Sequence, residues 1–381
     1  MNEMPLDGVT VLDCTQVMAG PFCTMLLGDM GAEVIKVEKP EGDDSRRMGP
    51  PFIGSESAAF LAINRNKKSI ILDFKKPEDV KIFKNIAAKA DVVVENFRPG
   101  TMARLGIGPE HLRKDHPELI YVSISGFGMT GKYSKRPGYD LIAQGMSGMM
   151  SVTGHPNSPP VKASIPLADL SAGMFAAFGT LSAYIYKLKT GIGQIVDTSL
   201  LDSAIALTPW EAAEFWGTGK PPAPKGSAHR LVAPYQAFQS IDGYFNIGVA
   251  NQPNFARLCN AIGRPELIQD LRFKDNPSRV VNYQELEKEI ELITKTKTTS
   301  EWLAILEAEN VPSGPILNME DVFKNEHVLQ RDMVQQQQHT TLGLVNHLGI
   351  PTKLSATPGK IRNAAPILGE HTAEILKRFS S

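Results

Sequence analysis

One carboxylate stands out in the sequence because of the residues that follow it. Asp169 lies near the start of the stretch 166–188, PLADLSAGMFAAFGTLSAYIYKL, and no charged residue occurs between Leu170 and Tyr186. We expect a helix that is apolar or small on every side and is therefore buried in the middle of a domain. Because the first turn of a helix carries unpaired N–H groups and a partial positive charge, the sequence predicts an ionised aspartate here.

Two roles are open for this carboxylate. Asp169 could simply cap the helix, as aspartate often does at this position. Alternatively, its neighbours are small and leave room for a ligand, and an ionised carboxylate is a nucleophile that needs no general base. These small neighbours are Ala168, Ser171, Ala172 and Gly173.

The elements before this helix have the pattern of an open, largely parallel sheet covered on both faces. Residues 9–12 and 33–37 read as buried strands of a β-α-β unit, whose helix begins near Pro21 and ends at Gly28 and Gly31. Further strands are expected at 69–74, 91–94 and 119–125, with helices at 77–90 and 109–114, and one more strand at 194–197 follows the helix of Asp169. Ligands of such sheets bind in the loops that leave the carboxyl ends of the strands.

Several of those loops carry cations. Lys39, Lys75, Arg98 and Arg104 could together face a polyanion, although each taken alone reads more readily as an ordinary solvated side chain. A different loop, 126–131, reads GFGMTG and matches a dinucleotide-binding pattern. The KYSKRPG that follows does not open an apolar helix, so we interpret the segment as a plain loop.

Composition limits the class of partner. Lys+Arg 40 against Asp+Glu 41 gives a net charge of -1, which argues against a general nucleic-acid or membrane-surface binder. The cysteines Cys14, Cys23 and Cys259 and the eight histidines have no metal-site spacing, so we expect reduced thiols and no metal. MNEMPLDG lacks the features of a signal peptide, and no apolar run reaches the roughly 20 residues of a membrane span, so a cytoplasmic location is expected.

The second half of the chain changes in composition. Residues 217–227, GTGKPPAPKGS, read as an extended linker, and PYQAFQSIDGYFNIGV then alternates on both sides of Asp242-Gly243 like a hairpin. We expect a large domain at 1–216, the linker at 217–227, a smaller α+β domain at 228–310, and a return to the large domain at 311–381. The polar run 335–338 has no interpretation at this level.

Nine segments, in this order, resemble the class III CoA-transferases, the CaiB/BaiF-type family. They are LDGVTVLDCTQVMAGPF, GDMGAEVIKVEKPEGDDSR, NRNKKSIILDFKKPE, ADVVVENFRPGTMARLG, SISGFGMTG, LADLSAGM, GQIVDTSLLDS, VPSGPILNMEDV and LGEHTAEIL. The resemblance implies a Rossmann-like large domain with a mainly parallel sheet and a smaller α+β domain. It also implies an interlocked, ring-like homodimer, which sequence rules would not propose because threaded chains are rare.

The resemblance assigns roles to residues. The catalytic aspartate of the family falls on Asp169. Its CoA contacts fall on Val17, Met18, Ala19, Lys39, Leu72, Lys75, Asn96, Phe97, Arg98, Arg104, Arg136, Tyr139 and Asp140. From the residues alone, Asp140 reads more readily as a helix cap than as a catalyst. No tightly bound cofactor is implied, since coenzyme A or an acyl-CoA is itself the substrate.

The implied activity is transfer of CoA from a donor acyl-CoA to a carboxylic acid through aspartyl anhydride and aspartyl-CoA thioester intermediates. One alternative is a 2-methylacyl-CoA racemase, but those relatives have His-Asp-Ile-Asn-Tyr where this chain has YDLIA at 139–143. That departure argues against racemisation, with His111 left as a possible second base. Another alternative is a non-catalytic CoA-binding protein.

Within the family, GDDSRRMGPPF, NRNKKSI and GSAHRLVAPYQAF are most similar to the succinyl-CoA:glutarate branch. This likeness implies succinyl-CoA as the donor and a short dicarboxylate as the acceptor. The second carboxylate of the acceptor would need a cation, and Arg46 and His229 are the candidates. Arg46 could instead only form an ion pair with Asp43 or Asp44.

Overall fold

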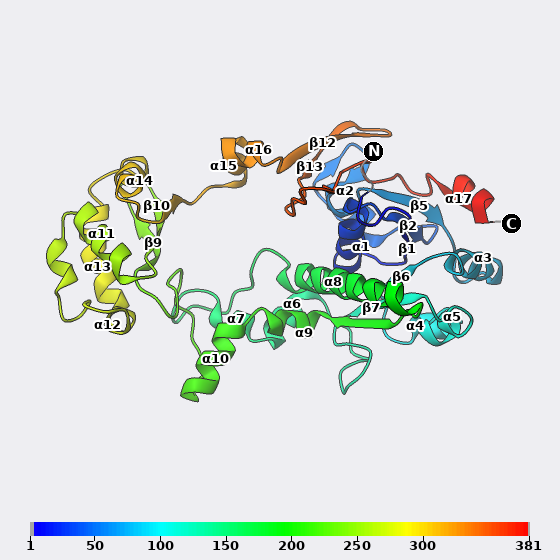
Figure 1. Ribbon diagram of the computed structural model, residues 1–381, viewed down its shortest axis with the longest axis horizontal. Coiled ribbons are helices and arrows are strands. Elements are labelled where there is room, and N and C mark those ends of the chain that lie inside the picture. The colour runs from blue at the N-terminus through cyan, green and yellow to red at the C-terminus, as the bar shows by residue number, and fades with distance from the viewer. Residues whose placement is uncertain (1–3, 380–381) are drawn as a thin grey trace. The chain divides into compact units, whose positions relative to one another are not determined.

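The computed structural model describes residues 4–379 and divides into two compact units (Figure 1). Unit 1 comprises Met1–Met149, Lys162–Ala213 and Glu326–Ser381. Unit 2 comprises Met150–Val161 and Glu214–Asn325. Unit 1 is therefore assembled from three separate stretches of the chain.

Unit 1 is built on a six-stranded parallel sheet, which confirms the predicted α/β class. The strands follow the order β5 (Lys67–Ile71), β2 (Glu33–Glu38), β1 (Thr10–Asp13), β6 (Val92–Glu95), β7 (Ile120–Ser125) and β8 (Ile195–Ser199). These strands are rich in valine and isoleucine, and nearly all their residues outside β8 are buried, as expected for a parallel sheet covered on both faces.

Two layers of helices cover the sheet. On one face α1 (Ala19–Asp29) and α8 (Leu167–Thr190) pack against alternate strand residues such as Val11, Val94 and Val122. The other face is covered by α3 (Pro77–Ala87), α4 (Thr101–Arg104), α5 (Pro109–Asp115) and the final helix α17 (Thr372–Phe379). Because strand side chains alternate, the four inner strands β2, β1, β6 and β7 contribute to both apolar layers.

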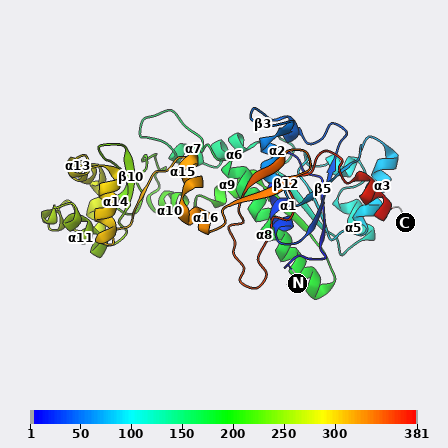
Figure 2. The same ribbon diagram turned by 90° about the horizontal axis from the view of Figure 1, so that it is seen from above.

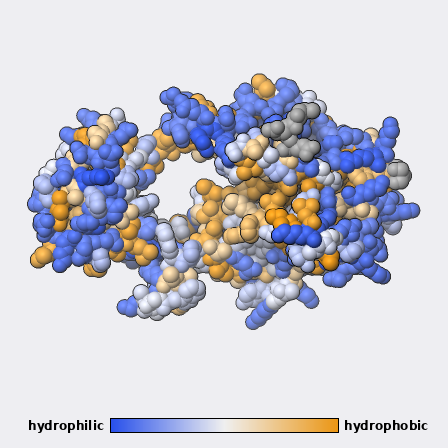
Figure 3. Space-filling model, viewed as in Figure 1, coloured by the Kyte–Doolittle hydropathy of each residue, from blue (hydrophilic) through white to orange (hydrophobic). Residues whose placement is uncertain are grey.

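Helix α8 is not buried on every side, contrary to the expectation from its sequence. Its small residues, among them Ala172, Ala176 and Ala183, are buried, and Gly173 lies so close to α1 that a Cβ atom there would come within 2.7 Å of the Ala19 carbonyl. The larger apolar residues face outward. We define the outer face of α8 as Met174, Phe175, Phe178, Leu181, Ile185 and Leu188, all of which are exposed. Figure 3 shows hydrophobic surface gathered over this part of unit 1.

The last stretch of the chain completes unit 1. Strands β12 (Val334–His339) and β13 (Gly343–Leu348) form a hairpin, so the uninterpreted run 335–338 is a strand. Val345 of this hairpin shares a small core with Phe60 of α2 (Ala58–Ile63). Figure 2 shows β12 close to α2. Beyond the hairpin, residues 363–372 cover the free edge of β5. There Asn66 N donates to Asn363 O, His371 N to Ser69 O, and Ile71 N to Thr372 Oγ1.

Shorter elements connect these layers in unit 1. They are the 3-10 helix η1 (Asp44–Arg47), the small hairpin β3 (Phe52–Ile53) and β4 (Glu56–Ser57), α6 (Asp140–Met146), α9 (Leu200–Ala206) and α16 (Glu326–Gln330). Two more helices, α7 (Met149–Val152) and α10 (Pro209–Thr218), cross the boundaries between the units. Among residues 4–379, no helix is long and apolar enough to cross a bilayer.

Unit 2 is a small α+β domain with its own core. Its sheet has the order β11 (Ser313–Pro315), β10 (Tyr244–Gly248) and β9 (Tyr235–Gln239), and β9 pairs antiparallel with β10 as the hairpin pattern predicts. The helices are α11 (Gln252–Ala261), η2 (Pro265–Ile268), α12 (Asn276–Val281), α13 (Tyr283–Thr294), α14 (Thr299–Ala308) and α15 (Met319–Lys324). Buried Phe238, Phe245 and Trp302 form part of the core between them.

Candidate active site

Asp169 lines a cavity of about 240 Å³ in unit 1, at the carboxyl ends of the parallel strands. The side chain is half-buried and lies in the first turn of α8. The residues lining the cavity come from the end of β7, from the loops after β1, β2, β6 and β7, and from the starts of α1, α8 and α9. They are Gln16, Val17, Met18, Ala19, Asp44, Asn96, Phe97, Ile124, Ser125, Gly126, Gly138, Tyr139, Asp169 and Leu200.

The Asp169 carboxylate does not cap its own helix. Helix α8 begins after Pro166 with no side-chain cap, and no described residue donates a hydrogen bond to the Asp169 carboxylate. The capping acceptor is Asp140, whose Oδ1 accepts from Ala168 N at 2.9 Å and from Asp169 N at 3.4 Å. Gln144 Nε2 donates to the other Asp140 oxygen at 2.7 Å. Asp140 thus acts as a cap, but mainly for α8 rather than for α6, the helix that it begins.

This arrangement changes the protonation expected for Asp169. Burial raises the pKa of Asp169 to about 7, and the neighbouring Asp140 carboxylate contributes to the increase. The expectation of an aspartate fully ionised by the start of its helix is therefore wrong for this structure. The amides that would have lowered its pKa are directed at Asp140 instead.

The loop after β1 forms one wall of the cavity. Gln16 and Asn96 hold this loop to the loop after β6 through two hydrogen bonds, Gln16 N to Asn96 Oδ1 at 2.9 Å and Asn96 Nδ2 to Gln16 O at 2.8 Å. Val17 has a φ of 66°, which is rare for a β-branched residue. The pairing places Val17, Met18, Ala19, Asn96 and Phe97, all suggested by the resemblance, along the same cavity.

A glycine contact brings in the third loop. A Cβ atom on Gly138 would lie 2.8 Å from Gly126 Cα, so the two backbones touch at the end of β7. This contact holds residues 136–140 over the strand end, where Tyr139 lines the cavity. The GFGMTG segment is thus a loop, as interpreted, and its first glycine serves close packing.

The predicted CoA-binding cations lie outside this cavity. None of its described lining residues is a lysine or arginine. Lys75, Arg98, Arg104 and Arg136 are exposed, and Lys39 forms an ion pair with Asp44 at 2.8 Å. Arg98 lines a neighbouring cavity of about 240 Å³, which also includes Glu95 and His111.

Leu72 is placed differently from the other predicted contacts. Its side chain is 2% exposed and belongs to the apolar core beneath α3, and its N–H donates to Glu38 O at 2.8 Å. In this conformation Leu72 therefore exposes very little surface that a ligand could contact.

Arg46 is occupied by protein partners. Its guanidinium donates to both Glu38 oxygens at 2.7 Å, contacts Glu56, and stacks 3.6 Å from the centre of the Phe60 ring. Neither Asp43 nor Asp44 is its partner. Because this network uses the charged head of the side chain, the structure does not support Arg46 as the holder of a substrate carboxylate.

His229, the other candidate, belongs to unit 2. Its ring lies 5.1 Å from the ring of Tyr235, and its Nδ1 accepts a hydrogen bond from Leu231 N at 3.1 Å. Arg230 beside it binds Glu214 at 3.2 Å. These contacts stay within unit 2.

Sequence reasoning missed a set of buried charges beneath the cavity. Asp13, Lys36, Asp43 and Lys67 are almost fully enclosed and form two ion pairs, Lys36 with Asp43 and Lys67 with Asp13, each at 2.8 Å. The sequence contained one signal of these buried charges, because Asp13 and Lys36 lie within the apolar strand segments VTVLD and EVIKVE. Charged residues are seldom fully buried unless paired.

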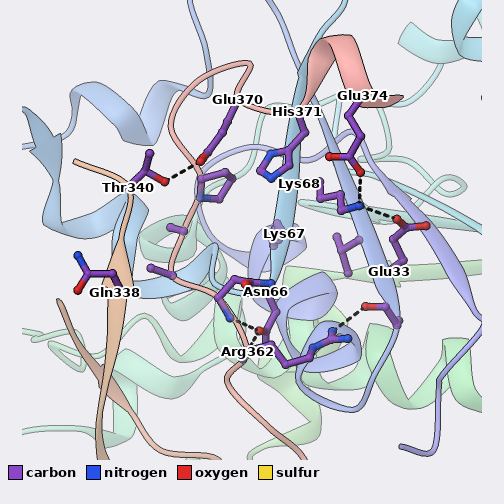
Figure 4. Close-up of a pocket in the computed structure, with 16 residues that line it drawn as sticks. Glu33, Asn66, Lys67, Lys68, Gln338, Thr340, Arg362, Glu370, His371 and Glu374 are labelled. Atoms are coloured by element: carbon purple, nitrogen blue, oxygen red, sulfur yellow. Dashed lines mark hydrogen bonds and ion pairs between the residues drawn. The ribbon is translucent and has the colours of Figure 1, made fainter. Parts of the chain in front are cut away.

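A larger cavity, of about 490 Å³, lies at the opposite ends of β2 and β5 (Figure 4). Its charged groups are bound to one another or to the backbone. Lys68 contacts Glu33 and Glu374 at 3.2 and 2.6 Å, and Arg362 donates to backbone carbonyls at the end of α1, including Gly28 O at 2.8 Å. This cavity contains no group prepared for covalent chemistry, so the site at Asp169 remains the candidate.

Comparison with known proteins shows the family to which this chain is similar. The profile described as CoA-transferase family III matches residues 6–372. The chain is 43% identical over 377 residues to "Succinyl-CoA:glutarate CoA-transferase" of Homo sapiens, covering 99% of this chain and 86% of that protein. It is 39% identical over 381 residues to "Succinyl-CoA:mesaconate CoA-transferase" of Haloarcula hispanica, covering 97% and 95%.

A solved structure is similar over the same length. The crystal structure of a CAIB/BAIF family protein from Brucella suis has a TM-score of 0.88 and 38% sequence identity, covering 99% of this chain and 100% of that one.

Proposed function

The chain belongs to CoA-transferase family III and is a CoA-transferase, and from this premise we propose that it moves CoA from succinyl-CoA to a short dicarboxylate, with Asp169 as the nucleophile. The observation that carries the proposal is the Asp169 carboxylate itself. It lines a cavity at the strand ends and, among the described residues, accepts no hydrogen bond that would occupy its oxygens.

The proposed reaction needs only this carboxylate and the two substrates. Asp169 attacks the thioester carbonyl of the donor, and the C–S bond breaks to give a mixed anhydride and CoA thiolate. The thiolate then attacks the aspartyl carbonyl, which releases succinate and leaves an aspartyl-CoA thioester. The acceptor carboxylate attacks that thioester, and the C–S bond breaks to give a second mixed anhydride and CoA thiolate. The thiolate then attacks the acceptor carbonyl of this anhydride, which forms the new acyl-CoA and frees the Asp169 carboxylate.

The choice of substrates rests on the relatives. The names of the two relatives described above both contain succinyl-CoA, and glutarate and mesaconate are both short dicarboxylates. The lining of the Asp169 cavity supplies amide and hydroxyl groups from Gln16, Asn96 and Ser125, but no cation. Among the described lining residues, no cation is available to hold the second carboxylate of the acceptor, and His229 remains a prediction from the sequence.

The remaining predicted contacts are proposed for the CoA portion of the substrate. Lys39, Lys75, Arg98, Arg104 and Arg136 are charges outside the Asp169 cavity and suit the phosphates of CoA. Val17, Met18, Ala19, Asn96, Phe97 and Tyr139 line the cavity and suit the reactive end.

A racemase would need a second proton-transfer group beside Asp169. His111, the candidate for that role, lines the neighbouring cavity and does not line the cavity that contains Asp169. The geometry therefore favours transfer over racemisation.

The outer face of α8 supports a homodimer. Phe178 is 70% exposed and Leu188 70%, on a helix with no charged residue over most of its length. Exposed apolar patches of this kind mark interaction surfaces. We propose that a second copy of the chain covers this face, as the interlocked dimer implied by the family resemblance would require.

The nucleophile is tested by replacing Asp169 with asparagine. Asp169→Asn should lower CoA transfer more than about 100-fold, because the carboxylate oxygen that attacks is lost. Incubation with succinyl-CoA followed by hydroxylamine should modify the peptide containing Asp169 in the wild type only.

Asp44→Asn is the matched control, since Asp44 also lines the cavity but is paired with Lys39. It should keep transfer within a few-fold of the wild type. Retained activity in Asp169→Asn, or modification of a different aspartate, would contradict the proposed mechanism.

A further inference from the structure

The buried charges under the catalytic cavity are more than an ordinary stabilising pair. The side chains of Asp13, Lys36, Asp43 and Lys67 are all 0% exposed in their ion pairs. Removing such charges from water costs several kcal/mol per ion, so apolar residues of similar size would often be as stable or more stable. Four of them in one cluster therefore indicate a purpose other than stability.

Each member of the cluster is bound to the backbone of one loop. Lys36 Nζ donates to Thr15 O at 2.8 Å, and Asp13 Oδ1 accepts from Thr15 N at 2.9 Å. Asp43 Oδ1 accepts from Val17 N at 3.1 Å, while Lys67 Nζ donates to Pro21 O at 2.9 Å. The four charges thus hold residues 15–21, from the end of β1 to the first turn of α1.

This loop contains a strained residue at the cavity wall. The φ of 66° at Val17 is costly for a β-branched side chain and persists only where surrounding contacts enforce it. Asp43 bonds to the Val17 amide itself, and Lys36 binds both Asp43 and the carbonyl of Thr15. Val17, Met18 and Ala19 of this loop line the same cavity as Asp169.

The cluster keeps its charges at neutral pH. Burial alone would raise the pKa of Asp13, but Lys67 and Lys36 bring it well below its usual range. Burial opposes the charge of Lys36 as well, yet Asp13 and Asp43 raise the pKa of this lysine. Burial lowers the pKa of Lys67 to about 8, which leaves it mostly protonated at pH 7.

We propose that Asp13, Lys36, Asp43 and Lys67 are positioning residues for CoA transfer, which fix the Thr15–Pro21 backbone in the conformation that aligns the thioester with Asp169. This inference rests on the proposed function, since it assumes that the reaction takes place in the Asp169 cavity. The cluster would act through the loop and would not touch the reacting atoms.

A second buried ion pair provides a matched control. Arg65 binds Asp29 at 3.0 and 2.7 Å, with side chains that are 4% and 1% exposed, at the other end of α1 and away from the cavity. Replacing Arg65 should destabilise the fold to a similar degree, because it also leaves a buried charge without its partner. It should not disturb the Thr15–Pro21 loop.

The experiment compares Lys36→Met with Arg65→Met. Both variants should show a lower melting temperature. At saturating succinyl-CoA, kcat of Lys36→Met should fall tenfold or more, whereas kcat of Arg65→Met should stay within about threefold of the wild type. Equal losses of kcat in the two variants, or full kcat in Lys36→Met, would overturn the proposal.

Asp43→Asn is the second variant if Lys36→Met does not fold. It keeps an oxygen for the Val17 amide but removes the charge that pairs with Lys36, so kcat should again fall while the melting temperature changes less. A wild-type kcat in Asp43→Asn would contradict the proposal.

The rate of hydroxylamine modification at Asp169 distinguishes failure of the positioning proposal from failure of the proposed nucleophile. Slow modification in the cluster variants supports positioning, and no modification in the wild type means that the proposed nucleophile itself is wrong.

Discussion

Asp169 and Asp140 are neighbouring carboxylates with opposite surroundings. Asp140 accepts hydrogen bonds from two backbone amides of α8 and from Gln144. Asp169 accepts none from the described residues, and its pKa rises to about 7 through burial and through the charge on Asp140. The backbone amides thus favour ionisation of Asp140. The Asp169 carboxylate accepts no such hydrogen bond and is more basic, which suits a nucleophile.

A pH dependence follows from this difference. The nucleophile must be unprotonated, so kcat/KM should rise as the pH increases through about 7. Asp140→Asn removes the nearby negative charge, which favours ionisation of Asp169 and should move the midpoint to lower pH. Because burial is the larger cause of the raised pKa, the midpoint should stay above 3.8, the ordinary value. The measurement is kcat/KM for succinyl-CoA between pH 5 and pH 9.

Asp44→Asn serves as the control for this profile. It removes a carboxylate from the same cavity, but one whose charge is already paired with Lys39 and Arg47. Its midpoint should match that of the wild type. A midpoint in Asp140→Asn that stays in place or moves upward would show that Asp140 does not influence Asp169.

Much of the cavity lining could be anticipated from the sequence, but its electrostatics could not. The helix pattern points to Asp169, the family resemblance points to Val17, Asn96 and Tyr139, and all four line one cavity. The contacts of Arg46, by contrast, include a hydrogen bond that only folding brings about, since its guanidinium donates to the carbonyl of Pro366 at 3.1 Å. No local pattern reveals which partner a charged side chain will find over such a sequence distance.

At the level of elements, the hydrophobic patterns predicted the strands well and the helix ends less well. Gly28 lies inside α1, which ends at Asp29, whereas Gly31 has the positive φ of 115° that only glycine adopts readily. On sequence grounds either glycine could end the helix. In the structure Arg362, far along the chain, donates to the carbonyls of Gly28 and Ala32 at this helix end, and the local sequence does not reveal that contact.

The contact between Gly126 and Gly138 gives a prediction for the loop over the cavity. Gly138→Ala would place a Cβ atom 2.8 Å from Gly126 Cα, so the backbones must separate and carry Tyr139 and Asp140 with them. We expect kcat/KM to fall tenfold or more, because the cavity wall and the α8 cap both shift. The measurement is steady-state transfer together with a thermal melt, which should show a folded protein.

Gly217→Ala is the control for this substitution. Gly217 lies in α10 and has no atom within 4 Å of an added Cβ. It should leave transfer unchanged. If Gly138→Ala were equally harmless, the close approach of the two loops would not be required for activity.

At the level of the whole molecule, the sequence of α8 predicted a helix away from solvent on every side, but the single chain leaves its outer face exposed. Phe178→Asp would put a charge in the centre of the outer face of α8, which the proposed homodimer buries. We expect light scattering to give twice 41.6 kDa for the wild type and a mass near 41.6 kDa, or aggregation, for the variant.

The control for assembly is Leu271→Asp. Leu271 is 77% exposed but lies in unit 2, outside the α8 face. Its variant should keep the mass of the wild type. A wild type with the mass of a single chain, or a Phe178→Asp variant with the mass of a dimer, would mean that this face does not hold two copies together.

The covering of the β5 edge by residues 363–372 also bears on how the chain is made. Synthesis proceeds from the N-terminus, so β5 leaves the ribosome almost 300 residues before the segment that binds its free edge. Unit 2 has its sequence complete at residue 325, while unit 1 still lacks this cover. An uncovered strand edge is a template for pairing with another chain. A nascent chain therefore exposes the free edge of β5 until residues 363–372 have been synthesised, and a truncation before residue 363 would leave that edge uncovered permanently.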